Sequence, residues 1–392
     1  MTDASNEFRK RDLIFPVYLP SFLFSVGEGA VLPILPSAAE HLGANLSLAG
    51  FIAGISLIGQ VLWDVPAARM VAILGERRSM IAAGLTTCVA YIAAELTNSL
   101  LLLALAMVVV GAMTSVYGLA RHGWLAEHVP FAQRARALSL MGGIFRGGML
   151  VGPLLGSLII YLSGVQTVYY VAVVTTMLSA AVLFFSPRDA VSDVTEVEKI
   201  STYRVAMDNR GKLLTAGLSA AVVSVMRTVR GLGLPLWGLY IGMHPGTTSL
   251  IIGITGAIDF GLFYVSGQIM DRYGRRAALV PTLIGLSMGV VALTFAHNEF
   301  AFVLVALLFS LANATGSGLV LTIGADLAPP GERNEFLAAF RLMIDAATAA
   351  TPILLGFMTA TILLPGSMLV FGALGLAGAG LGYWSLPRNG IK

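Results

Sequence analysis

The sequence predicts an all-α integral membrane protein, with twelve transmembrane helices in two pseudo-symmetric six-helix halves. Three observations support this prediction. Only 11% of the 392 residues are charged, whereas a soluble domain has about 25% charged residues. The mean hydropathy is +0.84, and long apolar runs recur along the chain. Several short motifs also return at a constant offset of 199 residues.

The constant offset indicates a duplicated unit. Gly75-Glu76-Arg77-Arg78 returns as Gly274-Arg275-Arg276, and Gly54 returns as Gly253. In so apolar a chain, a duplicated half with basic loops predicts a transporter whose site lies between the halves. The further matches are Glu127 with Asp326, Pro130 with Pro329, Arg134 with Arg333, and Pro153-Leu154-Leu155-Gly156 with Pro352-Ile353-Leu354-Leu355.

The apolar runs are long enough to cross a bilayer as helices, which takes about 20 residues each. They predict spans at 13–38, 46–71, 79–97, 99–123, 136–162, 167–186, 213–241, 247–270, 277–296, 299–325, 335–362 and 366–387.

The loops between these spans differ in charge from one side to the other. Loops near Glu40, Asn98, Gly164, His244, Asn298 and Pro365 contain no Lys or Arg. Because basic loops stay in the cytoplasm, both termini are predicted to be cytoplasmic. The basic residues of the other side are Arg9, Lys10, Arg11, Arg69, Arg77, Arg78, Arg134, Arg136, Arg188, Lys199, Arg204, Arg210, Lys212, Arg272, Arg275, Arg276, Arg333, Arg388 and Lys392.

The longest polar segment divides the chain. We expect an N-terminal six-helix bundle at 1–187, a cytoplasmic linker at 188–212 and a C-terminal six-helix bundle at 213–392. The N-terminus carries no recognisable cleavable signal peptide. Cys88 is the single cysteine, which excludes a disulfide framework and a cysteine metal cluster.

Two kinds of segment resemble a known family. Gly267-Gln268-Ile269-Met270-Asp271-Arg272-Tyr273-Gly274-Arg275-Arg276 resembles the loop signature of the major facilitator superfamily, and residues 64–78 match it in the first half. Gly148-Met149-Leu150-Val151-Gly152-Pro153-Leu154-Leu155-Gly156 resembles the signature of that family's drug/proton antiporter branch. The resemblance implies the major facilitator fold and a set of gating-loop residues: Gly75, Arg77, Arg78, Gly267, Asp271, Arg272, Gly274, Arg275 and Arg276.

The first-half loop departs from the family signature. Ala68 and Ala72 stand where the signature has Gly and Asp, and Ile73 replaces its Arg. In the family, this Asp belongs to a charge cluster that stabilises the outward-facing state. Here Glu76 with Arg77, or the intact second copy, would have to make that cluster. On the fourth span, Val108 stands where the family has an Arg, and it stays open whether Arg121 replaces it.

Ionisable groups inside the spans are the candidate site residues. Each costs about 2.5–3.5 kcal/mol at mid-helix, so together they would cost on the order of 25 kcal/mol if unpaired. We therefore expect them to pair or to face a wet cavity. In the resembled fold, the spans that carry them line the central cavity. They are Glu28, Asp64, Arg121, Arg146, Arg227, Arg230, Asp259, Arg341 and Asp345.

Glu28 allows two interpretations. It is either a protonatable carboxylate that could also receive a cationic group, or a fixed ion-pair partner of Arg227 or Arg230. Gly27 and Gly29 flank it, which predicts open space around its side chain. Arg227 is the repeat counterpart of Glu28.

Three further carboxylates lie inside the spans, and two of them allow opposed interpretations. Arg146 and Asp345 are repeat counterparts, so they either form an ion pair that stabilises one conformation or act separately in the cavity. Asp345 is also four residues from Arg341, which favours a local pair on one helix. Asp64 is either a proton site or conformational switch, or a charge at a wetted helix end. Asp259 lies deeper, among small neighbours that indicate a cavity face.

Gly148, Gly152, Pro153 and Gly156 are spaced along the fifth span. Small residues let helices approach closely, and an internal Pro removes a backbone hydrogen bond. This pattern fits a hinge that moves against the eighth span, and it fits close packing equally well.

The functional prediction is a secondary active transporter, not an enzyme. The sequence contains no phosphate-binding loop, metal-ligand set or nucleophile arrangement, so we expect no cofactor, no metal and no nucleic acid partner. The first hypothesis is proton-coupled efflux of small amphipathic or drug-like compounds. The alternatives are uptake or exchange of an anionic metabolite, and a non-transporting receptor or lipid-moving protein. We expect a monomer that contacts membrane lipid in a prokaryotic inner membrane, with protons and a small-molecule substrate as its ligands.

Overall fold

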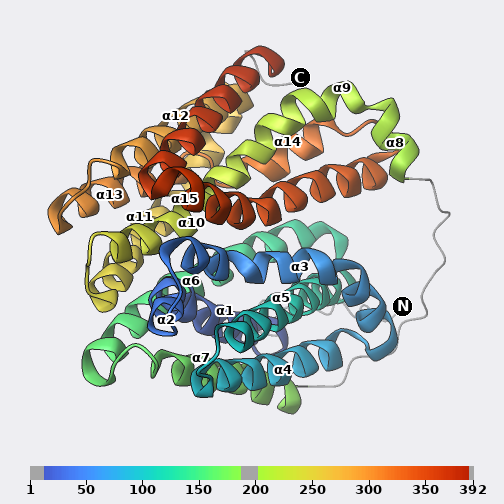
Figure 1. Ribbon diagram of the computed structural model, residues 1–392. Coiled ribbons are helices and arrows are strands. Elements are labelled where there is room, and N and C mark those ends of the chain that lie inside the picture. The colour runs from blue at the N-terminus through green and yellow to red at the C-terminus, as the bar shows by residue number, and fades with distance from the viewer. Residues whose placement is uncertain (1–12, 187–201, 388–392) are drawn as a thin grey trace. The chain divides into compact units, whose positions relative to one another are not determined.

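A computed structural model describes residues 13–186 and 202–387, and these residues form helices and connecting turns without any strand (Figure 1). The all-α prediction is therefore confirmed. The first span begins with a π-helical turn at Ile14–Tyr18 and contains a 3₁₀ turn at Leu32–Ile34. The helices are α1 (Leu19–Val31), α2 (Leu35–His41), α3 (Leu46–Leu74), α4 (Glu76–Leu96), α5 (Leu100–His128), α6 (Phe131–Ser163), α7 (Val168–Phe185), α8 (Thr202–Asp208), α9 (Arg210–Lys212), α10 (Leu218–Tyr240), α11 (Pro245–Tyr273), α12 (Arg275–Leu293), α13 (Glu299–Ala314), α14 (Leu319–Leu327) and α15 (Arg333–Ser385).

The helices account for the predicted spans. Ten described helices are long and apolar enough to cross a membrane, and the bent α11 brings the number to eleven. The last two predicted spans both lie in α15, which is interrupted at Leu363 by a backbone φ of 63°. Dividing α15 there gives twelve spans. The basic residues Arg9, Lys10, Arg11, Arg188, Lys199, Arg388 and Lys392 lie outside the described residues.

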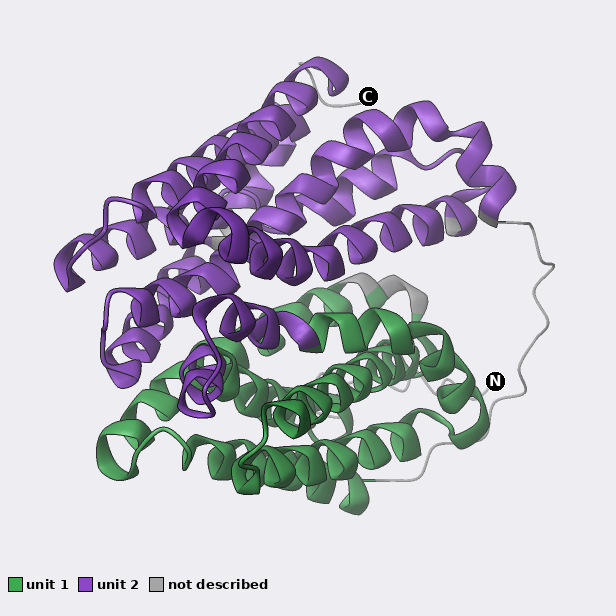
Figure 2. Ribbon diagram, in the orientation of Figure 1, with its two compact units in different colours: residues 1–32, 56–195 green, residues 33–55, 196–392 purple. Residues whose placement is uncertain are grey.

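The chain divides into two compact units, coloured separately in Figure 2. Unit 1 comprises residues 1–32 and 56–195, and unit 2 comprises residues 33–55 and 196–392. The predicted halves at 1–187 and 213–392 stay a prediction, as does the linker at 188–212. Within the linker range, α8 and α9 are helical, and α8 packs on α15.

In unit 1, α1 packs closely against α6 and α7. Glycines make this approach possible. A Cβ at Gly29 would lie 3.0 Å from the Cα of Met149, and one at Gly27 would lie 2.8 Å from the hydroxyl of Thr175. These two glycines therefore serve the packing of α1 on α6 and α7, and open space around the Glu28 side chain stays a prediction.

The glycines of the predicted hinge belong to the same contact. Gly148 faces Ser25, Gly152 faces Val26 and Ala30, and Gly156 lies against the backbone of Ala30. The helix α6 continues through Pro153. Close packing on α1 thus explains this glycine series inside unit 1, and its role as a hinge stays a prediction.

Replacing Gly152 with valine is expected to destabilise unit 1 by about 3 kcal/mol, the upper range for overpacking. A Cβ there would lie 2.5 Å from the carbonyl oxygen of Val26 and 2.6 Å from the amide nitrogen of Ala30, and backbone atoms cannot move aside easily. Thermal unfolding of the purified protein in detergent measures the loss. Gly143→Ala on the same helix is the control, because no atom lies within 4 Å of its added Cβ. Equal unfolding temperatures for the two variants would contradict the packing argument.

The sequence repeat is also visible in the backbone of each unit. Gly75 begins α4 with a φ of 79°, and its counterpart Gly274 begins α12 with a φ of 85°. Glycine is favoured at such positive φ values, because it has no Cβ to clash with the backbone. Both copies of the loop motif therefore place a glycine of positive φ directly before a helix.

Candidate functional site

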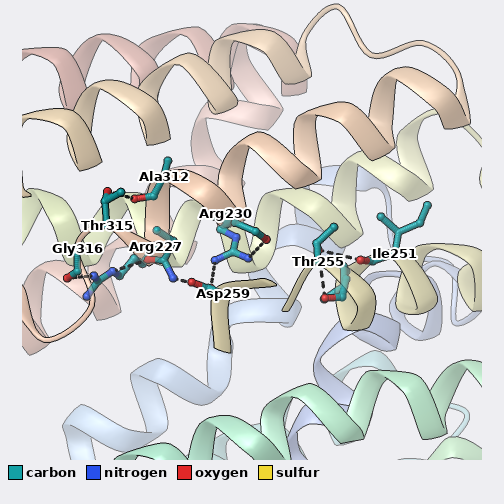
Figure 3. Close-up of polar contacts among 11 residues, drawn as sticks. Arg227, Arg230, Ile251, Thr255, Asp259, Ala312, Thr315 and Gly316 are labelled. Carbon is teal, nitrogen blue, oxygen red and sulfur yellow. Dashed lines mark hydrogen bonds and ion pairs between the residues drawn. The ribbon is translucent and has the colours of Figure 1, made fainter. Parts of the chain in front are cut away.

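Unit 2 contains a polar network inside its helices, drawn in Figure 3. Arg230 on α10 pairs with Asp259 on α11, with 2.7 Å between Nη1 and Oδ2. Its Nη2 donates to the hydroxyl of Ser310 on α13 at 2.9 Å. The side chains of Arg230 and Asp259 are 14% and 19% exposed, so this ion pair is largely withdrawn from solvent.

Asn313 on α13 connects this ion pair to a second arginine. Its amide nitrogen donates to Oδ2 of Asp259 at 2.6 Å, and its Oδ1 accepts from Nε of Arg227 at 2.8 Å. Because Arg227 occupies the amide oxygen, the amide nitrogen must point at Asp259. We call Arg227, Arg230, Asp259, Ser310 and Asn313 the Asp259 network.

The network is attached to a break in a membrane-spanning segment. The predicted span 299–325 is two helices, because α13 ends at Ala314 and α14 starts at Leu319 after Gly318, whose φ is 77°. Side chains satisfy the carbonyls freed by this break. Nη2 of Arg227 donates to the Gly316 carbonyl at 2.6 Å, and the Ser266 hydroxyl donates to the Ser317 carbonyl at 2.8 Å.

Discontinuous helices of this kind form the binding sites of many transporters, because their exposed backbone groups line a polar cavity. This break and the network residues Ser310 and Asn313 are not among the sequence predictions. The available signals were two glycines at Gly316 and Gly318 and an amide residue inside an otherwise apolar run.

Unit 1 contains a second pair of candidate residues, Glu28 and Arg121. Glu28 on α1 and Arg121 on α5 interact as opposite charges. Among the described residues, no donor reaches the buried Oε2 of Glu28, and no acceptor reaches the buried Nε of Arg121. The guanidinium of Arg121 lies over the ring of Phe145, with 4.6 Å from Cζ to the ring centroid. This carboxylate is therefore buried without being fully satisfied.

Asp64, Arg341 and Asp345 have partners within their own unit. Asp64 accepts a hydrogen bond from the hydroxyl of Ser115 on α5. Arg341 and Asp345 form a pair on α15 at 3.2 Å, and Arg341 is 72% exposed, which agrees with the interpretation as a local pair. Arg146 lies on an exposed face of α6. Its pairing with Asp345 stays a prediction, as does the pairing of Glu28 with Arg227.

The second-half gating loop forms a compact charge cluster. Arg275 donates to Asp326 at 2.6 Å and to the Met270 carbonyl at 3.0 Å, and it lies 3.9 Å from Asp271. Arg272 lies over Tyr273, and Cζ of Arg276 is 3.4 Å from the ring centroid of Tyr383. Gly267 is inside α11.

The first-half loop replaces this cluster with backbone contacts. Arg77, the repeat counterpart of Arg276, donates to the carbonyls of Leu183 and Phe184 at 2.7 and 2.6 Å. Phe184 is itself the counterpart of Tyr383, so both arginines contact the end of the last helix of their repeat. Arg78 is exposed. The counterparts of Arg275 and Asp326 are Glu76 and Glu127, two acids that cannot form an ion pair with each other.

Asp326→Asn is expected to lower the free energy of unfolding by about 1–2 kcal/mol, between the values for exposed and for buried ion pairs. The carboxylate is 25% exposed and holds Arg275 at 2.6 Å. Glu127→Gln is the matched control at the equivalent position of the other half, where we expect a change below about 0.5 kcal/mol. Thermal unfolding in detergent compares the two. A larger loss for Glu127→Gln would contradict the assignment of the cluster to the second copy.

Comparison with known proteins agrees with this architecture. The sequence profile of the Major Facilitator Superfamily matches residues 17–230 and 216–391. The class C tetracycline resistance protein of Escherichia coli is 25% identical over 304 residues, covering 74% of this chain and 75% of the relative. The multidrug resistance protein MdtG of Proteus mirabilis is 22% identical, covering 88% and 89%. The quinolone resistance protein NorA of Staphylococcus aureus is 22% identical, covering 82% and 81%.

Solved structures show the same fold at low sequence identity. A bacterial homologue of the human lysosomal transporter Spinster, in an inward-facing and unoccupied conformation, superposes with a TM-score of 0.79 at 12% identity, covering 97% of this chain and 98% of the other. A D-xylose–proton symporter superposes with a TM-score of 0.74 at 15% identity, covering 96% and 98%. The glycine-initiated loops, the profile match over most of the chain and the shared fold lead to one assignment: this chain belongs to the Major Facilitator Superfamily and is a multi-pass membrane transporter, not an enzyme.

Proposed function

We propose that the protein is a secondary transporter that exports small amphipathic compounds in exchange for protons, by alternating access. The observation that supports this most directly is the buried, incompletely hydrogen-bonded carboxylate of Glu28 beside the charge of Arg121. Ionisable groups are costly inside a membrane protein and are generally retained for transport. The relatives named for tetracycline, multidrug and quinolone resistance support the efflux direction.

In this proposal, Glu28 is the proton site of unit 1. A bound proton neutralises Glu28 and leaves the positive charge of Arg121 without its carboxylate. Loss of the proton restores the pair. Since each state changes the local charge by one unit, the proton can bias which conformation the transporter adopts. The protein would act as a monomer in a bacterial inner membrane, with both termini in the cytoplasm.

Flux in proteoliposomes tests the proposal. Vesicles with an acidic lumen should accumulate tetracycline or norfloxacin when the purified protein is present, and a pH-sensitive dye in the lumen should report proton loss. Dissipating the gradient with a protonophore should stop the accumulation. If tetracycline, norfloxacin and ethidium all equilibrate as they do in protein-free vesicles, the efflux proposal is wrong.

A further inference from the structure

Three helices of unit 1 meet in a junction beside Glu28. The helix α7 packs against both α1 and α4 (Figure 1). Thr176 on α7 lies at the centre of this junction. A Cβ on Gly27 of α1 would lie 3.0 Å from its Oγ1, and a Cβ on Gly84 of α4 would lie 3.9 Å from its Cγ2. Because Gly27 directly precedes Glu28, the junction adjoins this carboxylate.

Buried oxygens in and beside the junction lack hydrogen-bond partners among the described residues. They are Oε2 of Glu28 on α1, Oγ1 of Thr176 on α7 and the hydroxyl of Tyr169 on α7. A buried polar atom is costly to leave unpaired, and in folded proteins such atoms are generally satisfied by protein groups or by ordered water. Water that bridges two or more polar atoms is therefore the expected occupant of this interface.

Two buried tyrosines continue from the junction to one end of the helices. Tyr91 on α4 is 2% exposed and interacts electrostatically with both Glu28 and Tyr169. Tyr169 is 1% exposed and is the second residue of α7. It interacts in turn with Glu95, near the end of α4. These helix ends adjoin two loops without Lys or Arg, which the charge pattern predicts to lie outside the cytoplasm.

Groups of this kind can relay a proton. Tyrosine and threonine hydroxyls and water each donate and accept hydrogen bonds. In a chain of such groups, each accepts a proton from one neighbour and releases its own to the next, so no group keeps a charge. Proton relays are a recurring use of polar residues inside membrane transporters. At the inner end of this series, Glu28 can keep the proton, and Arg121 on α5 interacts with it as the opposite charge.

We propose that ordered water between α1, α4 and α7 joins Tyr169 and Tyr91 into a chain that delivers protons from the outer surface to Oε2 of Glu28. A proton enters from outer water at Tyr169, and the last transfer forms the O–H bond of Glu28. All these residues belong to unit 1, so the proton has a path of its own. Glu95 is not part of the chain, because its partly exposed side chain lies beyond Tyr169, where water arrives directly. The inference deepens the proposed proton exchange and rests on it.

Hydroxyl-radical footprinting of the intact protein in detergent tests for the water. An X-ray pulse turns bound water into radicals that oxidise the side chains beside it, and mass spectrometry measures the oxidation. We expect Tyr91 and Tyr169 to be oxidised several-fold faster than Tyr117. Tyr117 is the matched control, because it is also 1% exposed but shares a hydrogen bond with Ser179 at 3.0 Å and stacks on Phe24.

The variants Tyr91→Phe and Tyr169→Phe test the proton path. Each removes one hydroxyl and keeps the ring. The initial rate of gradient-driven tetracycline accumulation in proteoliposomes should fall at least about tenfold in each, since a proton-transfer step is interrupted. Exchange of tetracycline down its own gradient should stay at the wild-type rate, which shows that the variants fold. Tyr170→Phe, at the next position of α7 and 51% exposed, is the control and should keep both rates.

The inference is overturned if Tyr91 and Tyr169 are oxidised no faster than Tyr117. It is also overturned if either phenylalanine variant keeps the wild-type accumulation rate, or if Tyr170→Phe loses as much. Footprinting uses no substrate and no gradient. Oxidised tyrosines without any gradient-driven flux in the wild-type protein would therefore contradict the proposed exchange, whereas normal flux with unoxidised tyrosines would contradict the water chain alone.

Discussion

Replacing Arg230 with leucine is expected to lower the free energy of unfolding by about 3–5 kcal/mol, the cost of removing one partner of a buried ion pair. The remaining carboxylate of Asp259 would keep Asn313 as its donor and lose its compensating charge. Burial makes this loss large, because the two side chains are only 14% and 19% exposed. Thermal unfolding in detergent, followed by tryptophan fluorescence, measures the change.

The double variant Arg230→Leu with Asp259→Asn separates charge from packing. Removing both charges should recover most of the stability, because a neutral amide is far less costly to bury than an isolated carboxylate. Arg204→Leu is the control for the loss of an arginine, since its pair with Asp208 is exposed on both sides at 83% and 62%. If the double variant is as unstable as Arg230→Leu alone, charge compensation is not what stabilises this region.

The Glu28→Gln variant is expected to lose gradient-driven accumulation of tetracycline in proteoliposomes while it still exchanges tetracycline down its own concentration gradient. Glutamine has the shape of the protonated carboxyl and cannot release a proton. Coupled accumulation should therefore fall at least about tenfold, toward the level without a pH gradient, since one required proton transfer is removed. Parallel assays of driven uptake and of exchange separate coupling from folding.

Glu95→Gln provides a matched control for this experiment. Glu95, near the end of α4, is the second glutamate of unit 1 whose buried Oε2 finds no donor among the described residues. Its replacement should leave gradient-driven accumulation at the wild-type level. If Glu28→Gln retains that accumulation, or if both variants lose it equally, Glu28 is not the specific proton site.

Much of the fold follows from the sequence, because hydrophobic length and loop charge are local properties. The predicted spans match helices between α1 and α15, and the offset of 199 residues locates equivalent glycines of positive φ at Gly75 and Gly274. The break at Gly316–Gly318 was missed. A helix end inside a span depends on side chains such as Arg227 and Ser266 that satisfy the freed carbonyls, and these come from other helices.

The ionisable residues of the candidate site could also be found from the sequence, since charges inside apolar spans are conspicuous. Their partners could not. Asp259 was predicted as a cavity residue, and its pairing with Arg230 depends on how α10 and α11 pack. Asn313 stands out only as an amide in an apolar run, and Ser310 is a small residue of a kind that often serves packing, so the sequence does not show that either side chain contacts the Asp259 pair.

The sequence by itself determined that this chain crosses a membrane many times and holds charges where lipid would exclude them, and its constant offset predicts two related halves. Those conclusions need only composition, run length and periodicity. The tertiary structure decided which charges are compensated, which glycines serve packing of α1 on α6, and which atom of Asp259 is left without a donor. Hydrogen bonds form over about 3 Å between residues far apart in the chain, so their partners are set by packing and not by sequence spacing.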